Sequence, residues 1–207
     1  MKTIAKNTLS LTVITLVMGV LLGVVHHVTA EPIRIQEQKK IEEAYRNVFP
    51  EAEHFEERQL EGELAENFGE ALAADGYSDE SIDAVAHALD AEGELLGYVL
   101  TVTTSQGYGG DIQLTMGVSS DGTTEGIAFL SIGETAGLGM RADTEDFRSQ
   151  FSGRRTDYFV YSKTGASAEN EIDALSGATV TTNAVTRAVN AGLTAFRVLN
   201  AEGGEIE

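Results

Sequence analysis

An uncharged stretch near the N-terminus constrains this chain more than any other feature. No Lys, Arg, Asp or Glu occurs from Asn7 to Ala30, and a helix of about 20 apolar residues matches the ~30 Å hydrocarbon core of a bilayer. We therefore predict a transmembrane helix over Leu9 to Val28. A cleaved signal peptide is the alternative, because "VTA" at 28–30 has small residues suited to cleavage. Its apolar region would be unusually long, since roughly 7 to 15 residues are usual.

The charges on either side of this span predict its orientation. Lys2 and Lys6 precede the span, and all 33 Asp and Glu follow it. The positive-inside rule then makes residues 1–8 a cytoplasmic tail at the inner or plasma membrane and places the rest of the chain on the extracytoplasmic side. Gly19 and Gly23 form a GxxxG pair, which lets another membrane helix approach closely.

Composition argues against several classes of function. The formal net charge of -19 repels phosphodiester backbones, so nucleic acid is not an expected partner. The chain has no cysteine, which excludes thiolate-held iron–sulfur clusters and catalytic thiols. Redox chemistry would therefore need an organic cofactor or another polypeptide. No GxSxG nucleophile elbow is present, and the isolated His54 and His87 are not expected to bind metal.

We predict an α+β fold after the span, with a twisted antiparallel sheet and flanking helices. Residues 29–78 are expected to form a membrane-proximal helix and an acidic connector, followed by the α+β domain at residues 79–207. Apolar stripes and β-forming runs predict the individual elements. The expected helices are 78–93, 144–151 and about 182–199, and the expected strands are 95–103, 112–118, 126–132 and 157–161, with a hairpin turn at Asp121-Gly122.

The stretch "DALSGATVTTNAV", residues 173–185, places small and hydroxyl-bearing residues directly before the last predicted helix. A helix N-terminus directs backbone N–H groups and the positive end of its dipole outward, and such a point binds phosphate. Gly177 and Ala178 would allow close approach. The hydroxyl side chains that could donate hydrogen bonds are Ser176, Thr179, Thr181 and Thr182. An ordinary helix cap uses the same residue types, so both interpretations stay open on the residues alone.

The letters Asp-Ala-Leu-Ser-Gly-Ala-Thr in this stretch resemble the acceptor motif Asp-x-x-Ser/Thr-Gly-Ala-Thr of FMN-binding domains. In that family a flavin transferase uses FAD to esterify FMN phosphate onto the threonine hydroxyl. The resemblance implies that FMN is bound covalently to Thr179. It also implies that Asp173, Ser176, Gly177 and Ala178 form the sequence that the transferase recognises.

A second segment, "GETAGLGMR" at 133–141, resembles the family's Glu-Thr-Pro-Gly-Leu-Gly-x-Lys loop. Ala136 replaces the proline, and Arg141 replaces the lysine while keeping its positive charge. "GYGGDI" at 107–112 resembles a third, glycine-containing segment. The resemblance implies further cofactor-binding residues, namely Glu134, Thr135, Gly137, Leu138, Gly139, Arg141, Thr181 and Thr182.

With the span and the overall length, the chain resembles the G subunits of Rnf complexes, membrane electron-transport chains that link ferredoxin and NAD to ion translocation. This resemblance implies an electron-transfer protein without catalytic residues of its own. Its partners would be other membrane and iron–sulfur subunits and a flavin transferase. The alternatives are the C subunit of the sodium-pumping NADH:quinone oxidoreductase, a standalone exported FMN electron carrier, and a non-redox anchored surface module.

Overall fold

The computed structural model describes residues 2–203 and divides into two compact units, Met1–Glu42 and Glu43–Glu207. Helix α1 runs from Lys2 to Val48 with Pro32 inside it, whereas the sequence suggested a span followed by a separate helix. A proline removes one backbone hydrogen bond of a helix, and α1 continues through that gap. By length and composition, this helix can cross a membrane.

The second unit is built on a six-stranded sheet whose strands follow one another in chain order. They are β1 (His54–Arg58), β2 (Glu80–Leu89), β3 (Leu95–Thr104), β4 (Ile112–Ser119), β5 (Thr123–Ser131) and β6 (Arg154–Arg155). Every neighbouring pair is antiparallel, which confirms the predicted class. The predicted hairpin turn joins β4 to β5, and the Asp121 carboxylate accepts the N–H of Thr123 at 2.9 Å. Strands β7 (Val160–Ser162) and β8 (Glu171–Asp173) form a separate parallel pair.

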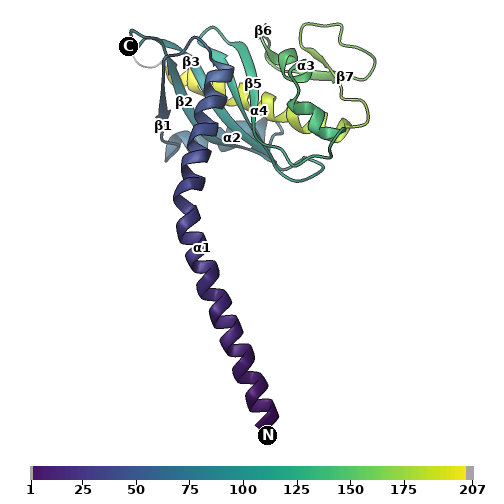
Figure 1. Ribbon diagram of the computed structural model, residues 1–207. Coiled ribbons are helices and arrows are strands. Elements are labelled where there is room, and N and C mark those ends of the chain that lie inside the picture. Colours follow the sequence, from purple (N-terminus) through teal and green to yellow (C-terminus); the bar gives the residue numbers. More distant parts are fainter. Residues whose placement is uncertain (1, 204–207) are drawn as a thin grey trace. The chain divides into compact units, whose positions relative to one another are not determined.

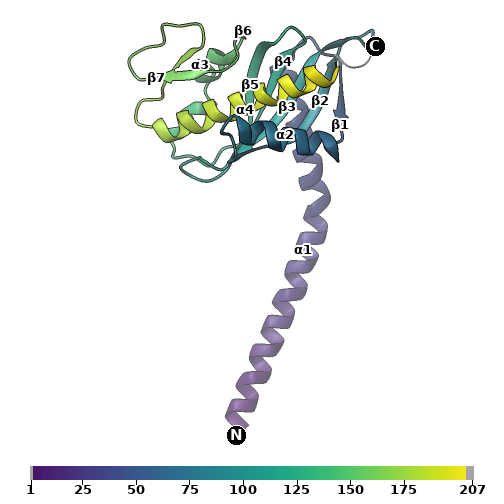
Figure 2. The same ribbon diagram turned by 180° about the vertical axis from the view of Figure 1, so that it is seen from behind.

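Helices pack on both faces of the sheet. Helices α2 (Glu63–Ala74) and α4 (Thr179–Gly203) cover one face (Figure 2). The last turn of α1 lies on the other (Figure 1), where a Cβ added to Gly117 would lie only 2.6 Å from the backbone oxygen of Val48. Glycine at this position of β4 therefore permits the close contact. After β5 come the short turns η1 (Gly139–Asp143), α3 (Glu145–Arg148) and η2 (Ser149–Phe151).

The helix predicted over 78–93 is wrong, because the structure has strand β2 there. The prediction relied on an apolar stripe of Ile82, Val85 and Leu89, of which the first two are three residues apart as on a helix face. A bulge between Ile82 and Ala84 inserts one extra residue into the strand, so that Ile82 and Val85 both pack toward the core. The bulge thus reproduces a helical spacing within a strand.

Elements β1 and α2 lie in the segment that the sequence analysis assigned to an acidic connector. Strand β1 pairs along its whole length with β2, and α2 buries Leu64, Phe68 and Leu72. These three residues are spaced by four, so they form one apolar stripe beneath an otherwise acidic surface. The structure places both elements in the unit that starts at Glu43.

Candidate functional site

A pocket of about 560 Å³ lies at the N-terminal end of α4. Three segments that are distant in the sequence line it: the loop between β3 and β4, the loop after β5, and the first turn of α4 with the two residues before it. These are the three segments that the sequence analysis singled out. The lining residues are Tyr108, Glu134, Thr135, Leu138, Gly139, Gly177, Ala178, Thr179, Val180 and Thr181.

Glu134 joins two of these loops. Its carboxylate is buried, and its Oε1 atom accepts the backbone N–H of Tyr108 at 2.7 Å and that of Gly109 at 3.3 Å. Hydrogen bonds to an ionised carboxylate are stronger than those between neutral groups. Glu134 therefore holds the β3–β4 loop against the loop after β5.

Helix α4 begins at Thr179, three residues before the start that its apolar pattern suggested. Its first i to i−4 hydrogen bond runs from the N–H of Thr182 to the carbonyl of Ala178 at 3.0 Å. Within the described part of the chain, the N–H groups of residues 179–181 therefore have no acceptor inside the helix. These groups and the helix dipole make this end of the pocket attractive to an anion.

The four hydroxyl groups of the acceptor stretch have different surroundings. Thr181 and Thr182 are buried. The Thr182 hydroxyl donates to the carbonyl of Ala178 at 2.9 Å and accepts the N–H of Leu175 at 3.1 Å, so it ties the motif to the helix. Ser176 is exposed and does not line the pocket. Thr179 alone combines partial exposure with a place in the pocket wall.

Five of the residues expected at the site do not line the pocket: Asp173, Ser176, Gly137, Arg141 and Thr182. The Asp173 carboxylate accepts the N–H of Ala166 at 2.5 Å. The backbone N–H of Asp173 donates to the side-chain oxygen of Gln150 at 2.6 Å. Arg141 lies exposed in η1. None of the ten lining residues carries a positive charge.

Tyr108 and Val180 were not predicted from the sequence as site residues. Both line the pocket and are strongly exposed, Tyr108 at 74% and Val180 at 51%, and Leu138 joins them at 45%. Together these three side chains form an apolar rim. The sequence "GYGG" offered one indication for Tyr108, because it places a single large side chain among glycines, whose permissive backbone suits a loop that presents that side chain to a ligand.

Gly139 permits the contact between the loop after β5 and α4. A Cβ added there would lie 2.5 Å from Oγ1 of Thr181 and 2.6 Å from Oε2 of Glu134. We expect Gly139→Ala to destabilise the domain by about 1–3 kcal/mol through overpacking, measured as a lower thermal midpoint. Gly133→Ala, whose Cβ would meet no atom closer than 3.6 Å, is the control. Equal midpoints for the two variants would contradict this expectation.

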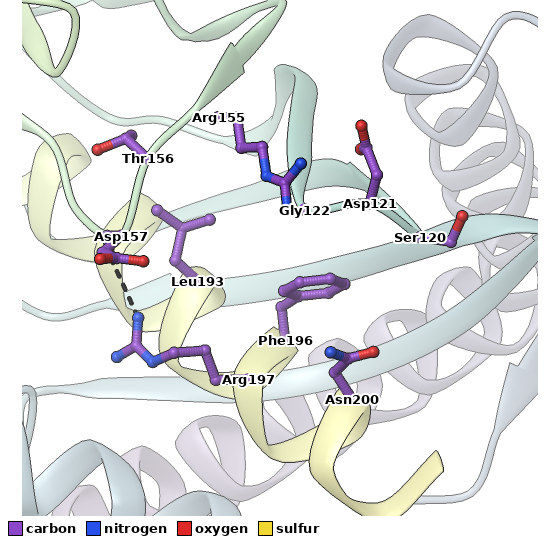
Figure 3. A pocket seen from close by; sticks show the side chains of 10 residues that line it. All are labelled: Ser120, Asp121, Gly122, Arg155, Thr156, Asp157, Leu193, Phe196, Arg197 and Asn200. Atoms are coloured by element: carbon purple, nitrogen blue, oxygen red, sulfur yellow. Dashed lines mark hydrogen bonds between the residues drawn. The ribbon is translucent and has the colours of Figure 1, made fainter. Parts of the chain in front are cut away.

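A second hollow, of about 660 Å³, lies along the C-terminal half of α4 (Figure 3). Arg197 there donates to the carbonyl of Asp157 at 3.1 Å and pairs with Asp75 at 2.6 Å. Phe196, which also lines it, follows Thr179 by 17 positions, or roughly 26 Å along a helix. The hollow contains no residue of the acceptor stretch and is separate from the candidate site.

Two family models match the chain. The FMN-binding domain matches residues 107–194, which include all three segments of the pocket. The RnfG N-terminal region matches residues 1–48, the whole of α1 included. The chain therefore carries an FMN-binding domain.

Two relatives are similar in sequence to this chain over most of its length. The G subunit of the Na(+)-translocating ferredoxin:NAD(+) oxidoreductase complex of Acetobacterium woodii is 29% identical over 96% of this chain and 94% of its own. The G subunit of the proton-translocating ferredoxin:NAD(+) oxidoreductase complex of Clostridium ljungdahlii is 28% identical over 88% of this chain and 85% of its own. The chain thus carries the RnfG N-terminal region and an FMN-binding domain, and it is similar over most of its length to G subunits of Rnf-type complexes, which confirms the resemblance drawn from its motifs.

Among solved structures, NqrC of Shewanella oneidensis has the same fold, with a TM-score of 0.50 at 24% identity. The match covers 57% of this chain and 59% of that one, so little more than half of each length superposes. At this identity the likeness concerns the fold alone.

Proposed function

We propose that the chain is the membrane-anchored flavoprotein of an Rnf-type ion-translocating oxidoreductase complex. It relays electrons between the redox centres of partner subunits, iron–sulfur subunits among them, through FMN held on Thr179 by a phosphoester. The observation that carries the proposal is the place of Thr179, at the first residue of α4 and in the wall of the pocket.

The surroundings of the hydroxyl groups favour Thr179 as the attachment site. A transferase must reach its acceptor, and Thr181 and Thr182 are buried. In the attachment step, the threonine oxygen bonds to the phosphorus of the FMN half of FAD, the pyrophosphate bond breaks and AMP leaves. The hydroxyl proton is released to a base. Asp173 and Ser176 lie outside the pocket, where the transferase could contact them without displacing the flavin.

The residues of the pocket fit FMN. Its volume of about 560 Å³ lies within the range of cofactor sites. The N–H groups of residues 179–181 suit a phosphate, and the rim of Tyr108, Leu138 and Val180 suits a flat, largely apolar ring. The flavin supplies electron transfer in single steps, while the protein supplies position and electrostatics.

Two features explain why the bond would be covalent. No lysine or arginine lines the pocket, so a phosphate there would be held by backbone N–H groups and hydroxyl groups without a cationic side chain. The distribution of charge around the candidate membrane span favours a domain outside the cytoplasm, where a released flavin would be lost by dilution. Occupancy of a reversible site follows free ligand concentration, whereas a phosphoester keeps the flavin bound.

The test is co-expression of the full chain with and without a flavin transferase, followed by a denaturing gel viewed for flavin fluorescence. We expect a fluorescent band only with the transferase, and a mass increase equal to FMN less water. A dark band, with the transferase active on a control substrate, would overturn the proposal. It would favour instead an anchored module in which the acceptor stretch only caps α4.

A further inference from the structure

A buried ion pair lies close to the pocket but outside it. Glu80, the first residue of β2, has a side chain with no exposed surface, while that of Arg187 on α4 is 25% exposed. The guanidinium binds the carboxylate through two bonds, Nε to Oε1 at 2.9 Å and Nη2 to Oε2 at 2.8 Å. Arg187 also donates to the carbonyl of Gly76 at 2.7 Å and lies 5.2 Å from the ring centre of Tyr77.

This ion pair is bonded to the start of the loop that carries Tyr108. The hydroxyl of Thr104, the last residue of β3, donates to Oε1 of Glu80 at 3.1 Å. That hydroxyl in turn accepts the N–H of Gln106 at 3.3 Å. The Gln106 side chain donates to Asp79 at 2.7 Å and accepts from Asn183 of α4 at 3.5 Å. The start of the loop is thus bonded to α4 and to the beginning of β2.

The loop is therefore held at two places. Its first residues depend on the Glu80–Arg187 pair and Thr104, and its tip, at Tyr108 and Gly109, depends on Glu134. Arg187 follows Thr179 by eight residues, or roughly 12 Å along the same helix. The pair thus fixes the start of the loop relative to the helix that carries the acceptor threonine.

We propose that Glu80 and Arg187 are positioning residues of the flavin pocket, which set the place of the Gln106–Gly110 loop, and hence of Tyr108, relative to Thr179. This inference rests on the proposed function for its consequence to the flavin. The paired geometry requires the planar fork of arginine, because a lysine ammonium keeps the charge but cannot make both parallel bonds.

The test compares Arg187→Lys with Arg197→Lys in the full chain in detergent. Arg197 is a matched control, because it also joins α4 to this part of the chain through an ion pair, with Asp75 at 2.6 Å, but ten residues farther along the helix. Amide hydrogen exchange of residues 105–110 is measured first on flavin-free protein, made without a transferase. We expect exchange in this loop to be roughly tenfold faster in Arg187→Lys and unchanged in Arg197→Lys.

The same variants carrying flavin give a second readout, the ratio of flavin fluorescence before and after denaturation. A displaced Tyr108 changes the environment of the ring, so we expect a change of about twofold in Arg187→Lys only. A dark wild-type protein would defeat the proposed function, while the exchange result would still decide the positioning role.

Unchanged exchange of residues 105–110 in Arg187→Lys would overturn the inference, and so would equal acceleration in Arg197→Lys or throughout the domain. If Arg187→Lys does not fold, Thr104→Val replaces it, because this variant removes the hydroxyl that joins Glu80 to the loop and leaves the ion pair in place. Because the same hydroxyl also accepts the N–H of Gln106, exchange is then compared at residues 107–110 only. Slow exchange of these residues in Thr104→Val would likewise overturn the inference.

Discussion

Thr179→Ala is expected to abolish covalent flavin completely when the chain is co-expressed with a flavin transferase. The alanine has no oxygen with which to form the phosphoester, and the neighbouring hydroxyls of Thr181 and Thr182 are buried. The measurement is flavin fluorescence of the denatured band, together with the intact mass. Because Thr179 is only partly buried at the start of α4, we expect the thermal midpoint to fall little. Unfolding of the variant would then not explain the loss of the flavin.

Two matched variants make this expectation specific. Thr181→Ala removes a hydroxyl that is buried two residues away, and it should keep the full covalent flavin. Ser176→Ala removes the exposed hydroxyl of the motif and should slow attachment without preventing it, because this side chain lies outside the pocket. A fluorescent band in Thr179→Ala would show that the flavin is attached to another residue. Equal loss of fluorescence in Thr179→Ala and Thr181→Ala would contradict the assignment to Thr179 alone.

The sequence predicted those parts of the fold in which local spacing and tertiary packing agree. Strands β3, β4 and β5 were expected nearly where they lie, because β-forming runs are bounded by turn residues such as Asp121-Gly122. The bulge after Ile82 explains why β2 was predicted as a helix, since an inserted residue interrupts the two-residue alternation of side chains by which a strand is predicted. Helix α2 was missed because its buried apolar stripe, Leu64, Phe68 and Leu72, lies within a strongly acidic stretch.

For the site, the resemblance identified the three segments, but their meeting depends on contacts far apart in the chain. The bond from the Tyr108 N–H to Glu134 spans 26 positions, and no local pattern specifies it. Arg141 was expected near the cofactor because it replaces the lysine of the family's loop, yet it lies in a short turn whose path decides where the side chain points. Glu80 and Arg187 are 107 positions apart in the sequence, so no local pattern predicts that they form an ion pair.

That pair provides the largest expected effect on stability. Glu80→Ala should destabilise the domain by about 3 kcal/mol, because it leaves the arginine and the Thr104 hydroxyl without the buried carboxylate. Hydrogen bonding to Glu80 is the main reason that the pKa of Arg187 is raised. For a domain of this size, such a loss lowers the thermal midpoint by roughly 6–12 °C. It is measured by circular dichroism of the full chain in detergent.

Two comparisons separate the loss of a buried partner from the loss of any ion pair. Asp75→Ala removes the ion-pair partner of Arg197 and an acceptor of the Thr194 hydroxyl. Both charged side chains are nearly half exposed, so the cost should be about 1 kcal/mol, well below that of Glu80→Ala. The double variant Glu80→Leu/Arg187→Met removes both buried charges and should recover part of the single-variant loss, because apolar residues of similar volume often replace a buried pair at little cost. If the double variant were less stable than Glu80→Ala, the two residues would stabilise the domain through separate contacts, and the pair would not act as one unit.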